Sequence, residues 1–313
     1  MFNREFEAMP LAEMKKLQLE RLKWSLNHAY KNNAYYARKF DASGFDPSSF
    51  KSLDDMKRVP FLTKQDMRDN YPFGLFAVPL KDVVRVHSSS GTTGNATVVG
   101  YTSKDIDVFA EVVARSLSSY GATSDDILQV AYGYGLFTGG LGLHYGGEKL
   151  GCLTVPISGG NTERQLMLIK DFGTSVLACT PSYALNIADY LEKKRPDYDI
   201  KKTSLRIGVL GAEPWTEAMR NEIETRLGIE AYDIYGLSEV IGPGVSAECS
   251  AKSGMHVFED HFYVEIIDPD TGEVLPEGEK GEIVYTSLTK YACPVIRYRS
   301  RDITRLYHDS CSC

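Results

Sequence analysis

The feature that most constrains the fold is a regular alternation of strand-like apolar runs and helical patterns between residues 126 and 235. The apolar runs at 126–131, 152–156, 175–180, 205–211 and 230–235 have strand length, and the segments between them carry apolar residues at helical spacings. Strands that alternate with helices form a mostly parallel sheet covered by helices on both faces. We therefore predict an α/β fold for this part of the chain.

The pattern changes on either side of this region. A long helix is predicted over 11–40, with Leu17, Trp24, Ala29 and Tyr30 among its buried residues, and Thr63 and Asp66 stand in capping-box spacing. After about residue 245 the helical patterns end, and short strands are predicted at 262–267, 282–287, 295–299 and 303–307. We predict two domains, an α/β core of residues 1–244 and a β-rich subdomain of residues 245–313.

Composition excludes several classes of function. The net charge is −7 with no basic block, so nucleic acid is an unexpected partner. No apolar run approaches the roughly 20 residues that a membrane span needs, and the N-terminus lacks the apolar core of a signal peptide. The six cysteines form no dense framework, which favours reduced thiols or metal ligands over disulfides. These observations predict a cytoplasmic protein.

The run HSSSGTTGNATVVGYT, residues 87–102, is the first candidate for a functional loop. A strand is predicted before it at 83–86, and Ser103 can cap the helix that follows. Glycines let a backbone fold tightly and approach an anion, and hydroxyl groups add hydrogen-bond donors without negative charge. The run suits the phosphates of a nucleotide, although it lacks the Gly-Lys-Ser/Thr ending of a Walker A loop. A plain surface loop is the alternative.

Three predicted strand ends also carry polar or small residues. They are Tyr132-Gly133-Tyr134-Gly135, Gly211-Ala212-Glu213-Pro214 and Tyr235-Gly236-Leu237-Ser238-Glu239. Ligands of parallel α/β sheets bind beyond the carboxyl ends of the strands. We therefore expect these segments to line a ligand site.

Several of these motifs occur together and in order with YRSRDIT near the end of the chain. Together they resemble the adenylate-forming superfamily of acyl-CoA synthetases, luciferases and adenylation domains. The runs QVAYGYGLFTGGLGLHYG, VLGAEPWTE, YDIYGLSEVIGPG and ECSAKSGMHVFEDHFYVEI are similar, more narrowly, to the phenylacetate–CoA ligases. The resemblance implies ATP-dependent activation of an aryl-acetic acid, through an acyl-adenylate, to its CoA thioester.

The resemblance also implies roles for particular residues. Glu239 would bind Mg²⁺ and act in catalysis with Thr92 and Thr93, and Asp302 would accept hydrogen bonds from the ribose. An exposed glutamate is the alternative for Glu239. The implied ATP and AMP site comprises Ser89, Ser90, Gly91, Thr92, Thr93, Gly94, Gly211, Ala212, Glu213, Pro214, Asp233, Ile234, Tyr235, Gly236, Leu237, Ser238 and Asp302. Arg299 and Arg301 would orient Asp302 or a phosphate, or else pair with Asp302 at the surface.

The implied acid pocket is apolar, with Tyr132 and Phe137 as aromatic walls and with Gly211 and Ala212 leaving room for a flat ring. Core packing is the alternative for the aromatic residues. We expect Lys64 to be a solvated lysine of a first helical turn. The sequence does not distinguish phenylacetate from hydroxyphenylacetate or indoleacetate as the acid.

The chain departs from the family in two respects. Asn95-Ala96 stands where the family loop often has Lys-Pro. The family also continues into a small C-terminal domain with a hinge and an adenylating lysine, so we expect this chain to be a large N-terminal domain that is incomplete for catalysis. Nucleotide binding without turnover, and delivery to a thiol other than CoA, are the alternatives. The family implies a homodimer.

The last candidate is a structural Zn²⁺ site made of Cys249, His256, Cys311 and Cys313. Neither Cys249 with His256 nor the Cys-x-Cys pair has standard zinc-finger spacing, but three thiolates and one imidazole would form a closed tetrahedral set. His261 and His308 are possible substitutes for His256. Two unrelated pairs of free thiols are the alternative.

Overall fold

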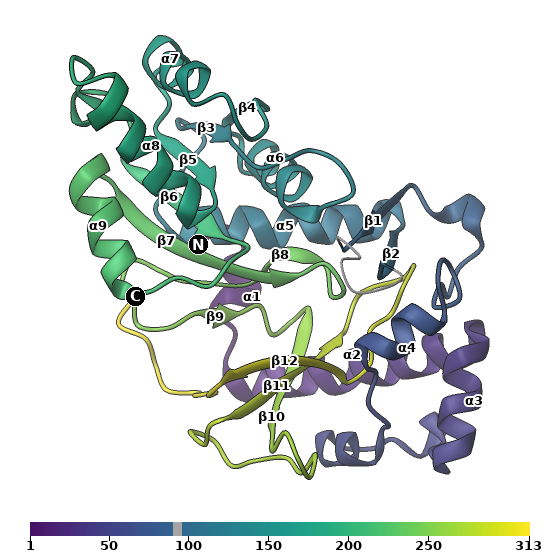
Figure 1. The fold of residues 1–313 in the computed structure, drawn as a ribbon. Coiled ribbons are helices and arrows are strands. Elements are labelled where there is room, and N and C mark those ends of the chain that lie inside the picture. Colours follow the sequence, from purple (N-terminus) through teal and green to yellow (C-terminus); the bar gives the residue numbers. More distant parts are fainter. Residues whose placement is uncertain (90–95) are drawn as a thin grey trace.

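The computed structural model describes residues 1–89 and 96–313, and its centre is a seven-stranded sheet (Figure 1). The strand order is β4 (Leu153–Val155), β3 (Ile127–Val130), β5 (Val176–Cys179), β6 (Ile207–Gly211), β7 (Glu230–Leu237), β8 (Gly242–Ala247) and β9 (His256–Val257). The pairs from β4 to β7 are parallel, and β8 and β9 are added antiparallel. The predicted α/β fold is confirmed.

Helices surround this sheet and form a separate N-terminal layer. The helices are α1 (Arg4–Glu7), α2 (Leu11–Asn32), α3 (Ala34–Ser43), α4 (Lys64–Asp69), α5 (Ser103–Ser119), α6 (Thr138–Leu150), α7 (Thr162–Phe172), α8 (Pro181–Lys194) and α9 (Glu217–Leu227), with short 3-10 helices η1 (Pro47–Ser49), η2 (Leu53–Arg58), η3 (Leu80–Asp82) and η4 (Ile200–Lys202). None of the helices in the described part of the chain is long and apolar enough to cross a membrane.

The sheet is covered on both faces, which explains its nearly continuous apolar strands. Along β5, Val176 and Ala178 belong to the hydrophobic cluster that contains α5 and α6. Leu177 and Cys179 alternate with them and belong to the cluster formed with α7, α8 and α9. Because side chains of a strand alternate between faces, both faces must be apolar when helices cover both.

The predicted helix over 11–40 is interrupted at Asn33. This residue is extended, and its side chain accepts hydrogen bonds from the backbone N–H groups of Tyr35 and Tyr36, so it ends α2 and caps α3. Ala29 is buried as expected, whereas Trp24 lies at the surface with 36 % of its area exposed. The apolar periodicity continues through Asn33, and only the capping bonds reveal the break.

The described residues near both ends of the run 87–102 form two paired strands. β1 (Arg85–Ser88) pairs antiparallel with β2 (Val98–Tyr101), and the predicted strand at 83–86 is therefore shifted by two residues. Thr102, and not Ser103, caps α5, because its hydroxyl accepts from the Asp105 N–H and the Asp105 carboxylate accepts from Thr102. The capping box predicted at Thr63 and Asp66 is present at the start of α4.

A smaller antiparallel sheet of β10 (Phe262–Ile267), β11 (Gly281–Ser287) and β12 (Tyr298–Thr304) completes the fold. The two short strands predicted at 295–299 and 303–307 are one strand, β12, which has a register irregularity against β11. The division predicted after residue 244 falls inside β8, which belongs to the large sheet. The two-domain division itself stays a prediction.

Candidate active site at the ends of β6 and β7

Close packing against the neighbouring strand requires glycine at the carboxyl ends of both β6 and β7, against β7 for Gly211 and against β8 for Gly236. A Cβ atom on Gly211 would stand 2.3 Å from the backbone oxygen of Ile234, and one on Gly236 would stand 1.8 Å from the backbone oxygen of Gly242. Ala212 follows Gly211 with a φ of +70°, a left-handed conformation that costs free energy in a residue with a side chain. Tight backbone packing therefore explains Gly211 without the aromatic ligand assumed in the sequence analysis.

Glu239 follows the end of β7 and is the most enclosed carboxylate of the predicted site. Only 5 % of its surface is exposed, and one carboxylate oxygen lies 3.2 Å from the Lys64 Nζ and 3.3 Å from the Thr97 Oγ1. The alternative of an exposed glutamate is wrong for Glu239. Thr97 belongs to the run 87–102 that is predicted to bind phosphates, so this end of the run reaches the carboxylate expected to bind Mg²⁺.

Lys64 is a functional candidate that the sequence analysis treated as an ordinary surface lysine. Residues Pro60–Leu62 run beside β12, because the Leu62 N–H donates to the Arg297 carbonyl and the Arg299 N–H donates to the Leu62 carbonyl. This pairing brings the first turn of α4 toward the sheet. Lys64 stays half exposed, yet its ammonium group pairs with Glu239 across 175 positions of sequence.

Lys290 supports the same segment from the interior. It is fully buried, and its ammonium group donates to the backbone carbonyl of Val240 at 2.6 Å and to that of Glu239 at 3.4 Å. Burial lowers the pKa of Lys290. The ammonium group also lies 5.0 Å from the ring centroid of Tyr101. A lysine in the turn after β11 gave no sequence signal, because only tertiary packing brings it to Glu239.

Asp302 and Tyr235 lie together on the other side of the candidate site. The Tyr235 hydroxyl donates to the Asp302 carboxylate at 2.6 Å, and the Asp302 N–H donates to the Ser300 hydroxyl at 3.0 Å. Burial is the main cause that raises the pKa of Tyr235, so it stays a donor. Both residues are predicted to lie at the nucleotide, and the structure brings them together.

The arginines beside Asp302 have a different partner from the one expected. Arg299 contacts the buried carboxylate of Glu282 at 2.6 Å, and Arg301 contacts the same carboxylate at 3.5 Å. The expected pairing of the two arginines with Asp302 is therefore wrong, and their role at a phosphate stays a prediction. Glu282 is fully buried on β11, and a buried carboxylate needs paired cations nearby.

Asp233 lies four residues before Leu237 on β7 and is partly enclosed. Burial raises the pKa of its carboxyl group to about 6, while a hydrogen bond from Trp215 opposes the shift. Its backbone carbonyl accepts from the Tyr120 hydroxyl at 2.9 Å, and its N–H donates to Glu248 at 2.7 Å. The backbone is therefore fixed on both sides, and the predicted contact of Asp233 with a base stays a prediction.

The aromatic residues expected to form the acid pocket have different environments. Tyr132 is buried, and its hydroxyl donates to the carbonyl oxygens of Cys179 at 2.6 Å and Gly211 at 3.3 Å, at the ends of β5 and β6. Phe137 is 45 % exposed at the start of α6. A Cβ on Gly139 would stand 2.6 Å from the Phe137 ring and 3.5 Å from the Tyr132 ring. Both rings therefore border Gly139, and only Tyr132 has core packing.

Other predicted residues are held by local contacts. Ser89 exchanges hydrogen bonds with Thr97, Glu213 accepts from the Ser182 N–H at the start of α8, and the Ser238 hydroxyl lies 3.3 Å from that of Thr138. Ser90, Gly91, Thr92, Thr93 and Gly94 lie outside the described residues. The assignment of all these residues to ATP or AMP stays a prediction.

The four residues expected to bind zinc lie together near the C-terminus. Their donor atoms are all within 4.8 Å of one another, with Cys249 buried, Cys311 half-buried, and His256 and Cys313 exposed. The proposed substitutes lie elsewhere: His261 contacts Thr289 at 2.7 Å, and His308 contacts Glu277 at 3.0 Å. The alternative of two unrelated pairs is therefore wrong as a description of their placement.

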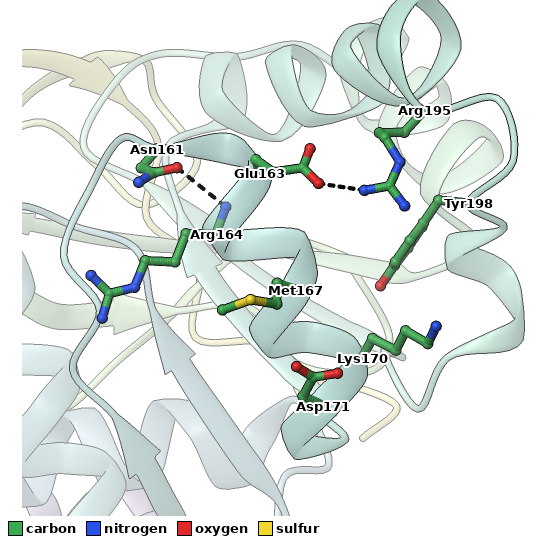
Figure 2. A pocket seen from close by; sticks show the side chains of 8 residues that line it. All are labelled: Asn161, Glu163, Arg164, Met167, Lys170, Asp171, Arg195 and Tyr198. Atoms are coloured by element: carbon green, nitrogen blue, oxygen red, sulfur yellow. Dashed lines mark hydrogen bonds and ion pairs between the residues drawn. The ribbon is translucent and has the colours of Figure 1, made fainter.

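A separate surface cavity of about 370 Å³ lies on α7 and beyond the end of α8 (Figure 2). Figure 2 shows Arg195 pairing with Glu163 at its rim, while Arg164 donates its backbone N–H to the Asn161 side chain. None of the predicted site residues that the structure describes lines this cavity. Cations and carboxylates are mixed there, so it offers no distinct site for an anion.

Known proteins match the chain over most of its length. The family described as AMP-binding enzyme matches residues 45–289. The phenylacetate-coenzyme A ligase of Aromatoleum evansii is 61 % identical over 94 % of this chain and 67 % of the relative. The enzyme of the same name from Escherichia coli K12 is 57 % identical over 96 % of this chain and 69 % of the relative.

Solved structures agree with this match. A 2-hydroxyisobutyryl-CoA ligase, in an open conformation with 2-HIB-AMP and CoA, superposes with a TM-score of 0.90 and 29 % identity, covering 96 % of this chain and 67 % of that one. The same ligase in the thioesterification state gives a TM-score of 0.91 and 30 % identity. The chain belongs to the AMP-binding enzyme family, and within that family to the phenylacetate–CoA ligases.

Proposed function

We propose that the protein activates phenylacetic acid with ATP and transfers the acyl group to CoA. A carboxylate oxygen of the acid attacks the α-phosphorus of ATP, and pyrophosphate leaves as the acyl-adenylate forms. The CoA sulfur then attacks the acyl carbon, and AMP leaves as the thioester forms. The observation that carries the proposal is the single segment Tyr235–Glu239, which holds Asp302 at one end and ends in a buried carboxylate at the other.

Different residues around this segment bind different parts of the nucleotide. Asp302, already a hydrogen-bond acceptor from Tyr235, offers a second carboxylate oxygen and further lone pairs to the ribose hydroxyls. Ser89 and Thr97 bring the described ends of the run 87–102 to Glu239. Because the first step joins two anions, donors and cations fixed at this position stabilise the transition state more than the separated reactants.

The residues at Glu239 fit a hard divalent cation. Its carboxylate is nearly enclosed, and its neighbours are the Thr97 hydroxyl and a lysine ammonium group. Mg²⁺ takes oxygen ligands, often one or two carboxylates together with substrate phosphates. When bound, Mg²⁺ would neutralise charge on the phosphates. The ammonium group of Lys64 would then be released from Glu239 and would be free to contact a phosphate oxygen.

The acid would bind beside Gly139, where two aromatic rings meet. Phe137 has half of its surface available for a ligand, while Tyr132 is fixed by its hydrogen bonds to Cys179 and Gly211. The exposed ring of Phe137 offers a stacking contact to a flat aromatic acid, while the buried ring of Tyr132 borders the same glycine from the core. The names of the relatives support phenylacetate as that acid and CoA as the thiol acceptor. The proposed reaction uses ATP, CoA and Mg²⁺ and gives zinc no part.

Acid-dependent exchange of labelled pyrophosphate into ATP tests the first step, and CoA thioester formation tests the second. In the enzyme that includes the family's C-terminal domain, we expect phenylacetate to support both reactions, and a short aliphatic acid such as propionate to support them at least about tenfold less, since burying an aromatic ring is worth more than about 1.4 kcal/mol. Exchange that is equal for all acids would contradict the aromatic pocket. Exchange with no acid would contradict the adenylation step itself.

The proposal also includes a cytoplasmic location and a homodimer. Its support is the resemblance to the family. Light scattering on the purified protein would measure the molar mass, and a value equal to one chain at micromolar concentration would contradict the dimer.

A further inference from the structure

A cluster of three thiols and one imidazole near the C-terminus has no task in the proposed reaction. Cys249 follows β8 by two residues, and His256 is the first residue of β9, so both belong to one hairpin of the large sheet. Cys311 and Cys313 follow β12 on the last segment of the chain. Figure 1 shows this segment running from β12 back toward β9. The donors therefore come from two parts of the chain that are 62 positions apart.

The hairpin holds its two donors in a fixed relation. Ala247 pairs with His256 across the antiparallel strands, and Cys249 lies two residues beyond that pair. The loop turns back through Lys252 and Gly254, which have φ angles of +49° and +88°. The Lys252 ammonium group contacts Glu224 at 2.6 Å, which fastens the loop to α9. Cys249 and His256 therefore face the C-terminal segment from a rigid support.

Two separations between the donor atoms match those of a tetrahedral zinc site. Zinc bonds of about 2.3 Å to sulfur and about 2.0 Å to nitrogen, at tetrahedral angles, place two sulfurs about 3.8 Å apart and a sulfur and a nitrogen about 3.5 Å apart. The structure has 3.7 Å between the sulfurs of Cys249 and Cys311, and 3.5 Å between the Cys313 sulfur and the His256 Nε2. All four donors lie within 4.8 Å of one another.

We infer that Cys249, His256, Cys311 and Cys313 bind one Zn²⁺ ion that fastens the C-terminal segment to the β8–β9 hairpin. Three thiolates and an imidazole are donors that zinc prefers, and four protein ligands leave no open position for catalysis. The segment is held a second time before it reaches the metal, because the His308 N–H and ring contact Glu277. The zinc ion attaches the segment after β12 to the β8–β9 hairpin. This attachment limits the movement of β12, the strand that carries Asp302.

Metal content gives the first test. The full chain, expressed without a histidine tag and dialysed in metal-free buffer, should contain about one zinc per chain by elemental mass spectrometry. Cobalt(II) in place of zinc should give the visible bands of a tetrahedral, thiolate-rich site. A folded wild-type protein without zinc, or a disulfide between Cys249 and Cys311 found by mass spectrometry, would overturn the inference.

Matched variants locate the ligands. His256→Gln should weaken zinc binding at least about tenfold in competition with a chelating dye, since even residues that merely support a ligand change metal affinity by about 10–100-fold. His308→Gln is the control, because His308 is also a histidine of this region and contacts Glu277 instead. Cys311→Ser should behave as His256→Gln does, whereas Cys152→Ser should not, because Cys152 donates to the Thr123 carbonyl far from the cluster. Equal losses in a ligand variant and its control would overturn the assignment.

Chelation of the wild-type protein keeps the test decisive if a variant fails to fold. Removal of zinc should increase hydrogen exchange in residues 305–313 and leave β5 and β6 protected, because those strands are buried on both faces of the large sheet. Unchanged exchange in 305–313 after complete zinc removal would contradict the fastening role. The site lies outside the nucleotide-binding residues, so these measurements do not depend on ligase activity.

Discussion

The hydrogen bond between Tyr235 and Asp302 makes Asp302→Ala the most informative substitution in the proposed nucleotide site. The bond is 2.6 Å long and joins a neutral hydroxyl to a carboxylate. Asp302 is exposed, so its removal leaves no cavity in the core. A carboxylate that binds a ribose should therefore affect nucleotide affinity much more than the free energy of unfolding.

The expected sizes of the two effects differ. Hydrogen bonds to a charged group are worth about 1.5–3 kcal/mol, which corresponds to an AMP dissociation constant about 10- to 150-fold higher in Asp302→Ala. The lost bond to Tyr235 is solvent-accessible and should cost about 0.5–1.5 kcal/mol of stability. For a chain of this size such a loss lowers the Tm by a few degrees.

Calorimetric titration with AMP, together with thermal unfolding, measures both quantities. Tyr235→Phe is the matched control, because it removes the same Tyr–Asp hydrogen bond but keeps the carboxylate. A 2′,3′-dideoxy analogue of AMP should bind the wild type weakly and Asp302→Ala no more weakly. The reasoning is refuted if AMP affinity is unchanged in Asp302→Ala while the Tm collapses, or if Tyr235→Phe loses as much affinity as Asp302→Ala.

Three further predictions follow from the other contacts of the site. Lys64→Met removes the ammonium group 3.2 Å from Glu239 and should lower pyrophosphate exchange by about 10- to 100-fold with little change in Tm, whereas the exposed Lys193→Met should have no effect on exchange. The raised pKa of Asp233, about 6, opposes folding once the group ionises, and this cost is absent below pH 4 and complete above pH 6. Urea unfolding should therefore show the stability of Asp233→Asn rising by about 1–3 kcal/mol relative to the wild type from pH 4 to pH 7, and a constant difference would contradict this. Phe137→Ala should reduce phenylacetate-dependent exchange at least about tenfold without changing AMP affinity, while Phe172→Ala, at another exposed phenylalanine, should change neither.

The sequence was informative wherever the pattern depended on local chemistry or on burial of a whole element. The alternation of strands and helices predicted the parallel sheet because apolar runs such as β5 are buried on both faces. The capping box at Thr63 and Asp66 needs only neighbouring residues, and it is present. Asn33 shows the limit of this approach, because apolar spacing continues through it and only its side-chain bonds divide α2 from α3.

Contacts between distant segments could not be predicted in the same way. Lys64 reaches Glu239 because the chain before α4 pairs with β12, and Lys290 supports the Glu239 backbone from the turn after β11. Arg299 and Arg301 were expected at Asp302, the nearest carboxylate in sequence. They pair instead with Glu282, since alternate residues of neighbouring strands meet across a sheet.

At Gly211 and in the cysteine cluster, the type of residue indicates a site. The spacing in the sequence, however, does not show why that residue is needed there. Gly211 was interpreted as space for an aromatic acid, yet the Ile234 carbonyl already occupies the position of a Cβ atom. The glycine therefore belongs to the site because it brings the ends of β6 and β7 together. Cys249 and Cys311 have no recognisable spacing, but the β8–β9 hairpin and the chain after β12 bring their sulfurs to 3.7 Å. In both cases the order of the strands in the sheet brings together atoms that are far apart in the sequence, and the distance between those atoms determines the role of the residue.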